Sequence, residues 1–428
     1  MTPMVSPFKT TTGLCLAELC YNSAPSEASL MPDHTHGAQL PEHPTKIVLL
    51  GHHGLFTYGE AHRARFHPQR RDARMPEGVE SETYLQWLSQ AAPDVQLHHL
   101  MSGYWISAAM GVAAELNLAD LLAAGPQTSA ALAQQTQTHS QAMYRLLRTL
   151  ASVGLLTEVE PGAFALTALG ALLRTDHPRS MRALTRYACS REQWQRWGAL
   201  RRAVETGGSV DREVLGMSGR EYRNRHPEAR DTMNEAMVSL VRQVVDAVVR
   251  AYDFARFQTL VDVGGGYGAL LSALLHSTPG LRGVLFDRPE VAEGATRHLA
   301  AAGVLDRCEV VGGDMFAEIP RGGDAYVFSR VIHDWDDERA TVALRNCRRV
   351  IDPRGTLLVI EEVILPGDAP GFGKLSDLNM LVGPGGQERT EAEYRALYTA
   401  AGFELTQVIP TQSRISIIVG VSREARKA

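Results

Sequence analysis

Three glycines, Gly264, Gly266 and Gly268, stand where an apolar segment of the chain gives way to a helical one. Residues 260–263 before them have the pattern of a buried strand, and residues 270–277 after them have that of a helix. Glycine permits main-chain conformations closed to other residues and lets a ligand lie against the backbone, while the first amides of the helix point at that ligand. The run predicts a nucleotide-type cofactor site, and taken alone it also fits the dinucleotide fingerprint.

An acid follows the next apolar segment. Asp287 ends a predicted strand at residues 283–286. At that place a carboxylate accepts hydrogen bonds from both ribose hydroxyls of a nucleoside, which NAD and S-adenosylmethionine share. Asp287 therefore supports a cofactor site without deciding between these two ligands.

The third and fourth predicted strands favour S-adenosylmethionine. The strand at 308–311 leads to Asp314, Met315 and Phe316, an acid and two apolar side chains that suit an adenine amino group and its ring. A dinucleotide would also need a pyrophosphate cradle and a nicotinamide pocket. The strand at 325–328 is followed instead by a polar segment that contains a histidine.

Six motifs in order make the chain resemble a known family. It is the class I S-adenosylmethionine-dependent O-methyltransferases, which include plant caffeate and flavonoid enzymes, acetylserotonin methyltransferase, and bacterial enzymes acting on phenazines and aromatic polyketides. The resemblance runs from about Gln96 to Arg423. The motifs are DVGGGYG at 262–268, GDMF at 313–316, HDW at 333–335, EVILP at 362–366, DLNM at 377–380 and GQERT at 386–390.

The resemblance implies a catalytic histidine. It assigns His333 as the general base that removes the proton of an acceptor hydroxyl, and it places Glu362 and Glu388 beside the ring. A carboxylate there would hold the tautomer and stabilise the imidazolium. A histidine that merely caps or fills, and ordinary surface glutamates, are the alternative readings.

The resemblance also assigns residues to both ligands. Ser329 departs from plant members, which carry lysine at this place, so its adenine contact is open. Asp334 and Asn379 would touch the acceptor directly or through another side chain, and no metal is implied. The cofactor-binding candidates are Gly264, Asp287, Asp314, Met315, Phe316, Ser329 and Arg330, and the substrate-binding candidates are Asn234, Met237, Asp334 and Asn379.

These residues need two domains to position them. Residues 81–255 have helical periodicity, and a hairpin turning at Pro161-Gly162 follows two short helices, the pattern of a winged helix. We expect Thr128 or Ser129 to cap the first of these helices and Ser140 the second. Their mostly apolar faces favour packing on a second copy over DNA, and the resemblance implies a homodimer. Residues 256–428 are expected to form a Rossmann-like α/β methyltransferase domain.

The first 80 residues are expected to be a poorly ordered extension. They are rich in Pro, Ser and Thr, and a short segment, 46–60, is similar to part of class II aldolases. The chain from Met75 onward should dimerise and act without them. Their histidines follow no known metal-site spacing and are His34, His36, His43, His52, His53, His62 and His67.

Composition and charge argue against several classes of protein. The net charge of −5 argues against nucleic acid as a partner, and no apolar run reaches the length of a membrane span. Five scattered cysteines suit a reducing compartment, so we expect a cytoplasmic protein. The sequence predicts a homodimeric O-methyltransferase of a small aromatic hydroxyl compound. A family member turned to a non-methylating reaction and a winged-helix regulator are the alternatives, and the acceptor itself cannot be named.

Overall fold

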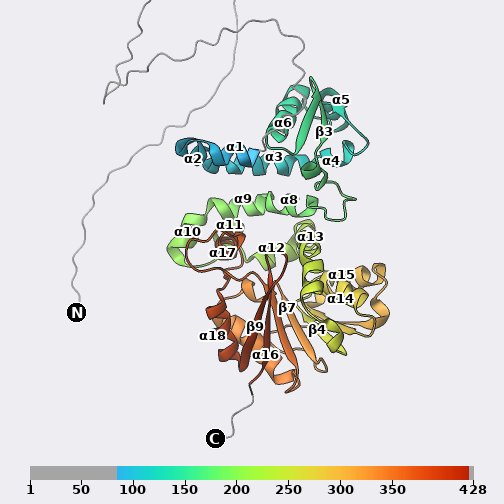
Figure 1. Ribbon diagram of the computed structural model, residues 1–428, viewed down its shortest axis with the longest axis vertical. Helices are drawn as coiled ribbons and strands as arrows, with labels where there is room; N and C mark the ends of the chain where they lie inside the picture. Colours follow the sequence, from blue (N-terminus) through green and yellow to red (C-terminus); the bar gives the residue numbers. More distant parts are fainter. Residues whose placement is uncertain (1–83, 424–428) are drawn as a thin grey trace, which may run out of the picture. The chain divides into compact units, whose positions relative to one another are not determined.

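The computed structural model describes residues 84–423. The expectations for the first 80 residues, including a start at Met75, fall outside this range, and the domain boundaries at 80 and 255 stay predictions. Helices predominate up to residue 251, and a seven-stranded sheet follows (Figure 1). The elements of the first part are α1 Tyr84–Gln90, α2 Pro93–Met101, α3 Gly103–Glu115, α4 Leu118–Leu121, β1 Gln127–Thr128, α5 Ser129–Gln135, α6 Ser140–Ser152, β2 Leu156–Glu160, β3 Ala163–Leu166 and α7 Ala168–Ala171.

The winged helix is confirmed by α5, α6 and a small sheet of order β1-β3-β2. Gly162, with φ of 80°, makes the predicted turn between β2 and β3. Thr128 caps α5 by accepting the amide of Ala131. The predicted cap of α6 is wrong: Ser140 is already helical, and His139 caps the helix instead, because His139 is the last residue with extended backbone before it.

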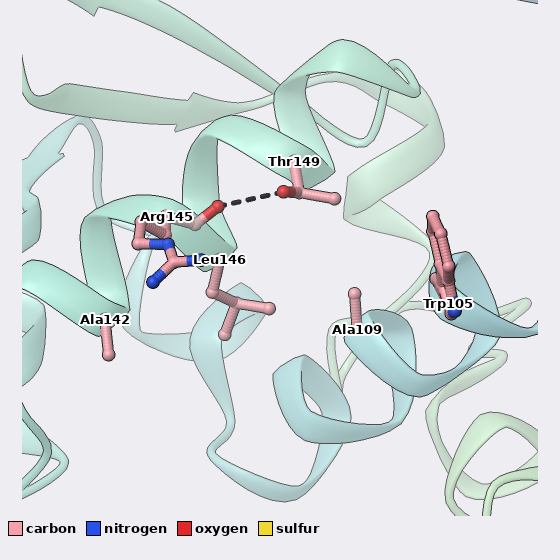
Figure 2. A pocket seen from close by; sticks show the side chains of 6 residues that line it. All are labelled: Trp105, Ala109, Ala142, Arg145, Leu146 and Thr149. Atoms are coloured by element: carbon pink, nitrogen blue, oxygen red, sulfur yellow. Dashed lines mark hydrogen bonds between the residues drawn. The ribbon is translucent and has the colours of Figure 1, made fainter. Parts of the chain in front are cut away.

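One face of α6 builds the core of this domain. Met143, Leu147 and Leu150 recur at helical spacing and pack with Leu132 and Phe164. A surface groove of about 370 Å³ lies between α3 and the outer face of α6 (Figure 2). It is lined by Trp105, Ala109, Ala142, Arg145, Leu146 and Thr149.

Six helices connect the winged helix to the sheet. The last of them, α13, is the longest at 25 residues, and it packs its apolar side on the sheet domain through Val244 and Val248. Ser239 of α13 also donates a hydrogen bond to the carbonyl of Ser180. The helices are α8 Arg182–Ala188, α9 Arg191–Gly198, α10 Leu200–Thr206, α11 Asp211–Leu215, α12 Gly219–Arg225 and α13 Pro227–Ala251.

The seven-stranded sheet has the order β6-β5-β4-β7-β8-β10-β9. Its first five strands are parallel, and β10 runs antiparallel to both of its neighbours. After β4 the chain adds β5 and β6 on one side of that strand, and it then returns to place β7 on the other side. The carboxyl ends of β4 and β7 therefore border the switch point where ligands of such sheets bind. The strands are β4 Thr259–Val263, β5 Arg282–Asp287, β6 Cys308–Gly312, β7 Ala325–Ser329, β8 Thr356–Glu361, β9 Phe403–Pro410 and β10 Ser416–Ser422.

Helices cover both faces of this sheet (Figure 1). Alternation along each strand divides the apolar side chains, so that Val261 of β4 packs with α16 and α18, while Leu260 packs with α13, α14 and α15. This arrangement confirms the Rossmann-like fold. The remaining helices are α14 Ala269–Ser277, α15 Pro289–Ala301, α16 Asp337–Val350, α17 Phe372–Val382 and α18 Glu391–Ala401, with short 3-10 turns η1 Phe254–Arg256, η2 Leu305–Arg307 and η3 Ile332–Asp334.

Candidate active site

The glycine loop joins β4 to α14 at the switch point. Gly264, Gly266 and Gly268 have φ of 73°, 59° and 79°, in the region that other residues rarely adopt. At Gly264 a side chain is also excluded by space, because a Cβ there would lie 2.7 Å from Cγ2 of Val331. The loop therefore offers bare backbone to a ligand.

Asp287, the last residue of β5, lies against this loop. Its Oδ2 accepts the amide of Gly266 at 2.8 Å, and its Oδ1 accepts the amide of Arg288 at 2.7 Å. Burial raises the pKa of Asp287, and the two amide hydrogen bonds oppose that rise. Each oxygen keeps a second lone pair, so the carboxylate can still accept two ribose hydroxyls.

Asp262 is a second acid at the loop, which sequence reasoning missed. It is 1% exposed, and neither carboxylate oxygen has a hydrogen-bond partner among the described residues. Burial and the charge of Asp287 raise the pKa of Asp262 to about 7. A buried acceptor without a donor fits a cationic ligand such as S-adenosylmethionine, which carries an ammonium and a sulfonium. An acid inside an apolar strand was the available signal.

The predicted adenine-binding residues follow β6. Asp314 is exposed and accepts the amide of Phe316 at 3.0 Å, while Met315 and Phe316 are half-buried. The ring of Phe316 meets Trp335 edge to face, with centroids 4.7 Å apart, and the guanidinium of Arg339 lies 4.2 Å from the Phe316 centroid. Trp335 is thus an additional wall of this region that was not singled out from the sequence.

His333 lies in η3, directly beyond β7, and is 3% exposed. Its Nδ1 is 2.9 Å from Oε1 of Glu388, and Ser376 donates a hydrogen bond to the same oxygen at 2.7 Å. Since a carboxylate oxygen accepts, Nδ1 carries the proton and Nε2 keeps a free lone pair. Oδ1 of Asp334 lies 3.8 Å from Nε2.

Opposing influences set the pKa of His333. Burial alone would lower it, but the charge and hydrogen bond of Glu388 and the charge of Glu361 outweigh burial and the nearby Arg330, so the pKa of His333 is raised above its ordinary value. The pKa of Glu388 is lowered: burial would raise it, and His333 and Ser376 prevail. The two shifts agree, and they describe an ionised carboxylate beside a basic imidazole.

Glu362 lies close enough to His333 for the charge of the ring to act on its carboxylate. It makes no hydrogen bond to His333, and its Oε1 instead lies 2.9 Å from the guanidinium of Arg414. The preceding residue, Glu361, was missed by sequence reasoning, and it contacts the backbone of the His333 turn. Glu361 is the last residue of β8 and Glu362 lies just beyond it, and of these two buried acids Glu361 is the one that accepts the amides of the turn.

The segment that carries Glu388 fits closely against the turn. The amide of Gln387 donates to the carbonyl of His333 at 2.9 Å. A side chain at Gly386 would collide with the carbonyl of His333 and the backbone of Asp334. The GQERT motif therefore needs its glycine so that Glu388 can reach the ring.

Ser329 is the last residue of β7 and Arg330 follows it, next to the glycine loop. Arg330 has a φ of 57°, which is uncommon for a residue with a side chain and marks local strain. Its Nε is buried with no hydrogen-bond partner among the described residues. Both features are consistent with the predicted role in ligand binding.

The predicted acceptor contacts come from separate helices. Asn234 and Met237 lie on α13, and Asn379 lies on α17, all three half-buried. The Nδ2 of Asn234 is buried and has no partner within the described part of the chain. Trp194 and Trp197 on α9 are each 37% exposed.

Residues 84–423 contain neither a ready-made metal site nor a membrane-spanning helix. No group of three or more His, Cys, Asp or Glu side chains there is arranged to hold a metal ion. No helix in the same range is long and apolar enough to cross a membrane.

Comparisons with known proteins agree with this geometry. An O-methyltransferase domain model matches residues 197–404, and an O-methyltransferase dimerisation domain model matches residues 98–176. The chain is 47% identical over 322 residues to phenazine O-methyltransferase PhzM of Lysobacter antibioticus, covering 75% of this chain and 94% of that one. The chain belongs to the O-methyltransferase family.

Two further similar proteins are a methyltransferase with bound cofactor and a hydroxylase. The crystal structure of human N-acetylserotonin methyltransferase in complex with S-adenosylmethionine matches with a TM-score of 0.73 and 29% identity, over 78% of this chain and 99% of that one. Aclacinomycin 10-hydroxylase RdmB of Streptomyces purpurascens is 36% identical over 333 residues, 75% of this chain and 89% of that one. The cofactor of the methyltransferase is S-adenosylmethionine.

Proposed function

We propose that this methyltransferase transfers a methyl group to a hydroxyl of a small aromatic compound, of the phenol, phenazine or polyketide type, with His333 as general base. The observation that carries the proposal is the hydrogen bond from Nδ1 of His333 to the ionised Glu388, which leaves Nε2 free. The similarity to a phenazine O-methyltransferase supports the acceptor class.

The proposed chemistry assigns one task to each group. Bound S-adenosylmethionine supplies a methyl group on a sulfonium, which is open to attack from the opposite side. Nε2 of His333 accepts the proton of the acceptor hydroxyl while the oxygen–carbon bond forms. Glu388 stabilises the imidazolium, and Asp262, Asp287 and the glycine loop hold the cofactor. The products are the methyl ether and S-adenosylhomocysteine, with the proton on His333 until it passes to water.

The test is a screen with a labelled methyl donor. Phenols, phenazines and anthracyclines are incubated with the purified protein, and the label is followed into the organic product. Transfer to an aromatic hydroxyl is expected. Label on an amine or carbon would contradict transfer to a hydroxyl. A product that has lost carbon dioxide or gained oxygen without the label would favour the non-methylating alternative, which the hydroxylase among the relatives exemplifies.

We propose further that the enzyme is a homodimer that forms through its dimerisation domain. Large apolar side chains on α1, α2 and α3 are exposed, and one of them, Trp105, lines the groove between α3 and α6 (Figure 2). Light scattering on the purified protein should give twice the chain mass of 46.8 kDa. These exposed side chains are Leu85, Trp87, Leu97, Leu100, Met101, Tyr104 and Trp105.

The activity is expected to depend on pH through His333. Only the neutral imidazole accepts a proton, and the pKa of His333 is raised, so kcat/KM should increase with pH through a midpoint above about 6.5, the ordinary histidine value. The measurement is a pH–rate profile at saturating cofactor. A midpoint below that value would contradict the assignment of His333 as the base.

A further inference from the structure

The turn that carries His333 is held by a buried acid at its amide side. Oε1 of Glu361 accepts the amides of Val331, Ile332 and His333 at 3.0, 2.7 and 3.2 Å. Glu361 is fully buried at the end of β8. A three-residue 3-10 turn cannot satisfy its own first amides, so this carboxylate supplies the acceptor that they need.

A buried base holds the carbonyl side of the same turn. Arg389 is also fully buried, and its guanidinium donates to the carbonyls of Ile332 at 3.3 Å and Trp335 at 2.8 Å. It is anchored in turn by Asp337, 2.9 Å away. The turn therefore lies between two opposite charges, each matched to the backbone groups that it faces.

We propose that Glu361 and Arg389 are positioning residues for the reaction: together they clamp the backbone of the turn and so fix where the ring of His333 points. The proposal rests on the proposed role of His333. A free turn of this length would have many conformations, and a misplacement of about 1 Å at the reacting group can cost on the order of 10²-fold in rate.

Glu361 has a second effect, through its charge. All four of its hydrogen-bond partners are donors, since Tyr394 donates to its other oxygen at 2.6 Å, and four donors favour the ionised form. Burial raises the pKa of Glu361, and the charge of His333 and the hydrogen bond from Tyr394 reduce that rise. The charged groups around His333 are Asp334 on its own turn, Arg330 at the end of β7, Glu361 and Glu362 at the end of β8, and Glu388 and Arg389 before α18.

The first experiment removes the charge and keeps the shape. Glu361→Gln retains an oxygen for the three amides, so the turn should persist while the titration midpoint of His333 moves to lower pH. The midpoint is read by NMR of ring-labelled histidine in the full-length protein without cofactor, with the His333 signal assigned by its absence in His333→Asn. Because no methyl transfer is needed, this result stands apart from the test of the proposed function.

The control for Glu361 is Asp324→Asn. Asp324 accepts the amides of Gln258 and Thr259, both at 2.8 Å, at the opposite edge of the sheet. Its replacement should leave the midpoint of His333 unchanged. An unchanged midpoint in Glu361→Gln, or an equal movement in Asp324→Asn, would overturn the assignment of Glu361.

The second experiment loosens the carbonyl side. Arg389→Met should lower kcat by about 10²-fold, with the dissociation constant of S-adenosylhomocysteine within about twofold of wild type. Arg389→Lys, which keeps the charge and some donors, should recover part of the loss, and it replaces the methionine variant if that one does not fold.

The matched control for Arg389 is Arg307→Met. Arg307 likewise donates to several backbone carbonyls, among them Leu275 at 2.8 Å and Pro279 at 3.0 Å, but on η2, away from the His333 turn. The Arg307→Met variant should lose thermal stability and keep the wild-type kcat. A folded Arg389 variant with wild-type kcat, or an Arg307 variant with an equal loss of kcat, would show that Arg389 is an ordinary structural residue.

Discussion

Replacing His333 by alanine is expected to lower turnover by about 10²- to 10⁴-fold, the usual cost of losing a general base. The variant should still bind S-adenosylhomocysteine, because the hydrogen bond of the ring runs to Glu388 and not to the glycine loop. Turnover is measured with a saturating aromatic acceptor near neutral pH, and cofactor affinity by calorimetry. The removal of a largely buried ring also leaves a cavity, so thermal unfolding is recorded beside both.

Two outcomes would separate this role from others. His276→Ala serves as the control. The ring of His276 lies on α14, and its hydrogen bond within the described residues is to the carbonyl of Ser272 in the same helix. Wild-type turnover in the His333 variant would remove the residue from the mechanism. Loss of cofactor binding together with turnover would assign His333 to cofactor binding instead of proton transfer.

Asp287→Ala should weaken cofactor binding strongly. Hydrogen bonds to a charged group contribute about 1.5 to 3 kcal/mol each, and about 1.4 kcal/mol is a factor of ten, so losing one ribose bond should raise the dissociation constant of S-adenosylhomocysteine by roughly 10- to 10²-fold. Loss of both would multiply these factors. The variant also frees the amides of Gly266 and Arg288, which adds to the effect by loosening the loop.

Calorimetry with S-adenosylhomocysteine measures this effect, and thermal unfolding tests whether the fold persists. Asp287→Asn keeps an oxygen for one of the two amides and should bind better than the alanine variant. Asp306→Ala, at an exposed acid on η2, is the control and should bind as wild type. An alanine variant of Asp287 that remains folded and binds with wild-type affinity would exclude Asp287 as the ribose ligand.

Much of this molecule follows from short stretches of its sequence. The glycine loop, the apolar strands around it and the turn at Pro161-Gly162 are local features, because backbone conformation and burial periodicity are set by neighbouring residues. The order of the six motifs likewise indicated the family, which the domain matches show. The position of His333 beyond β7 follows from the same pattern, since ligands bind at the carboxyl ends of such strands.

Only the tertiary structure decided which groups meet the histidine. Glu361 and Glu362 are adjacent acids at the point where β8 ends, and no local pattern shows that the first contacts the His333 turn while the second meets Arg414. Arg389 donates hydrogen bonds to backbone carbonyls more than fifty residues away in the chain. Every residue has a backbone carbonyl, so the sequence does not indicate which ones an arginine will contact. Contacts of this kind depend on how separate segments pack, and that packing alone makes a buried acid and a buried arginine the two supports of one turn.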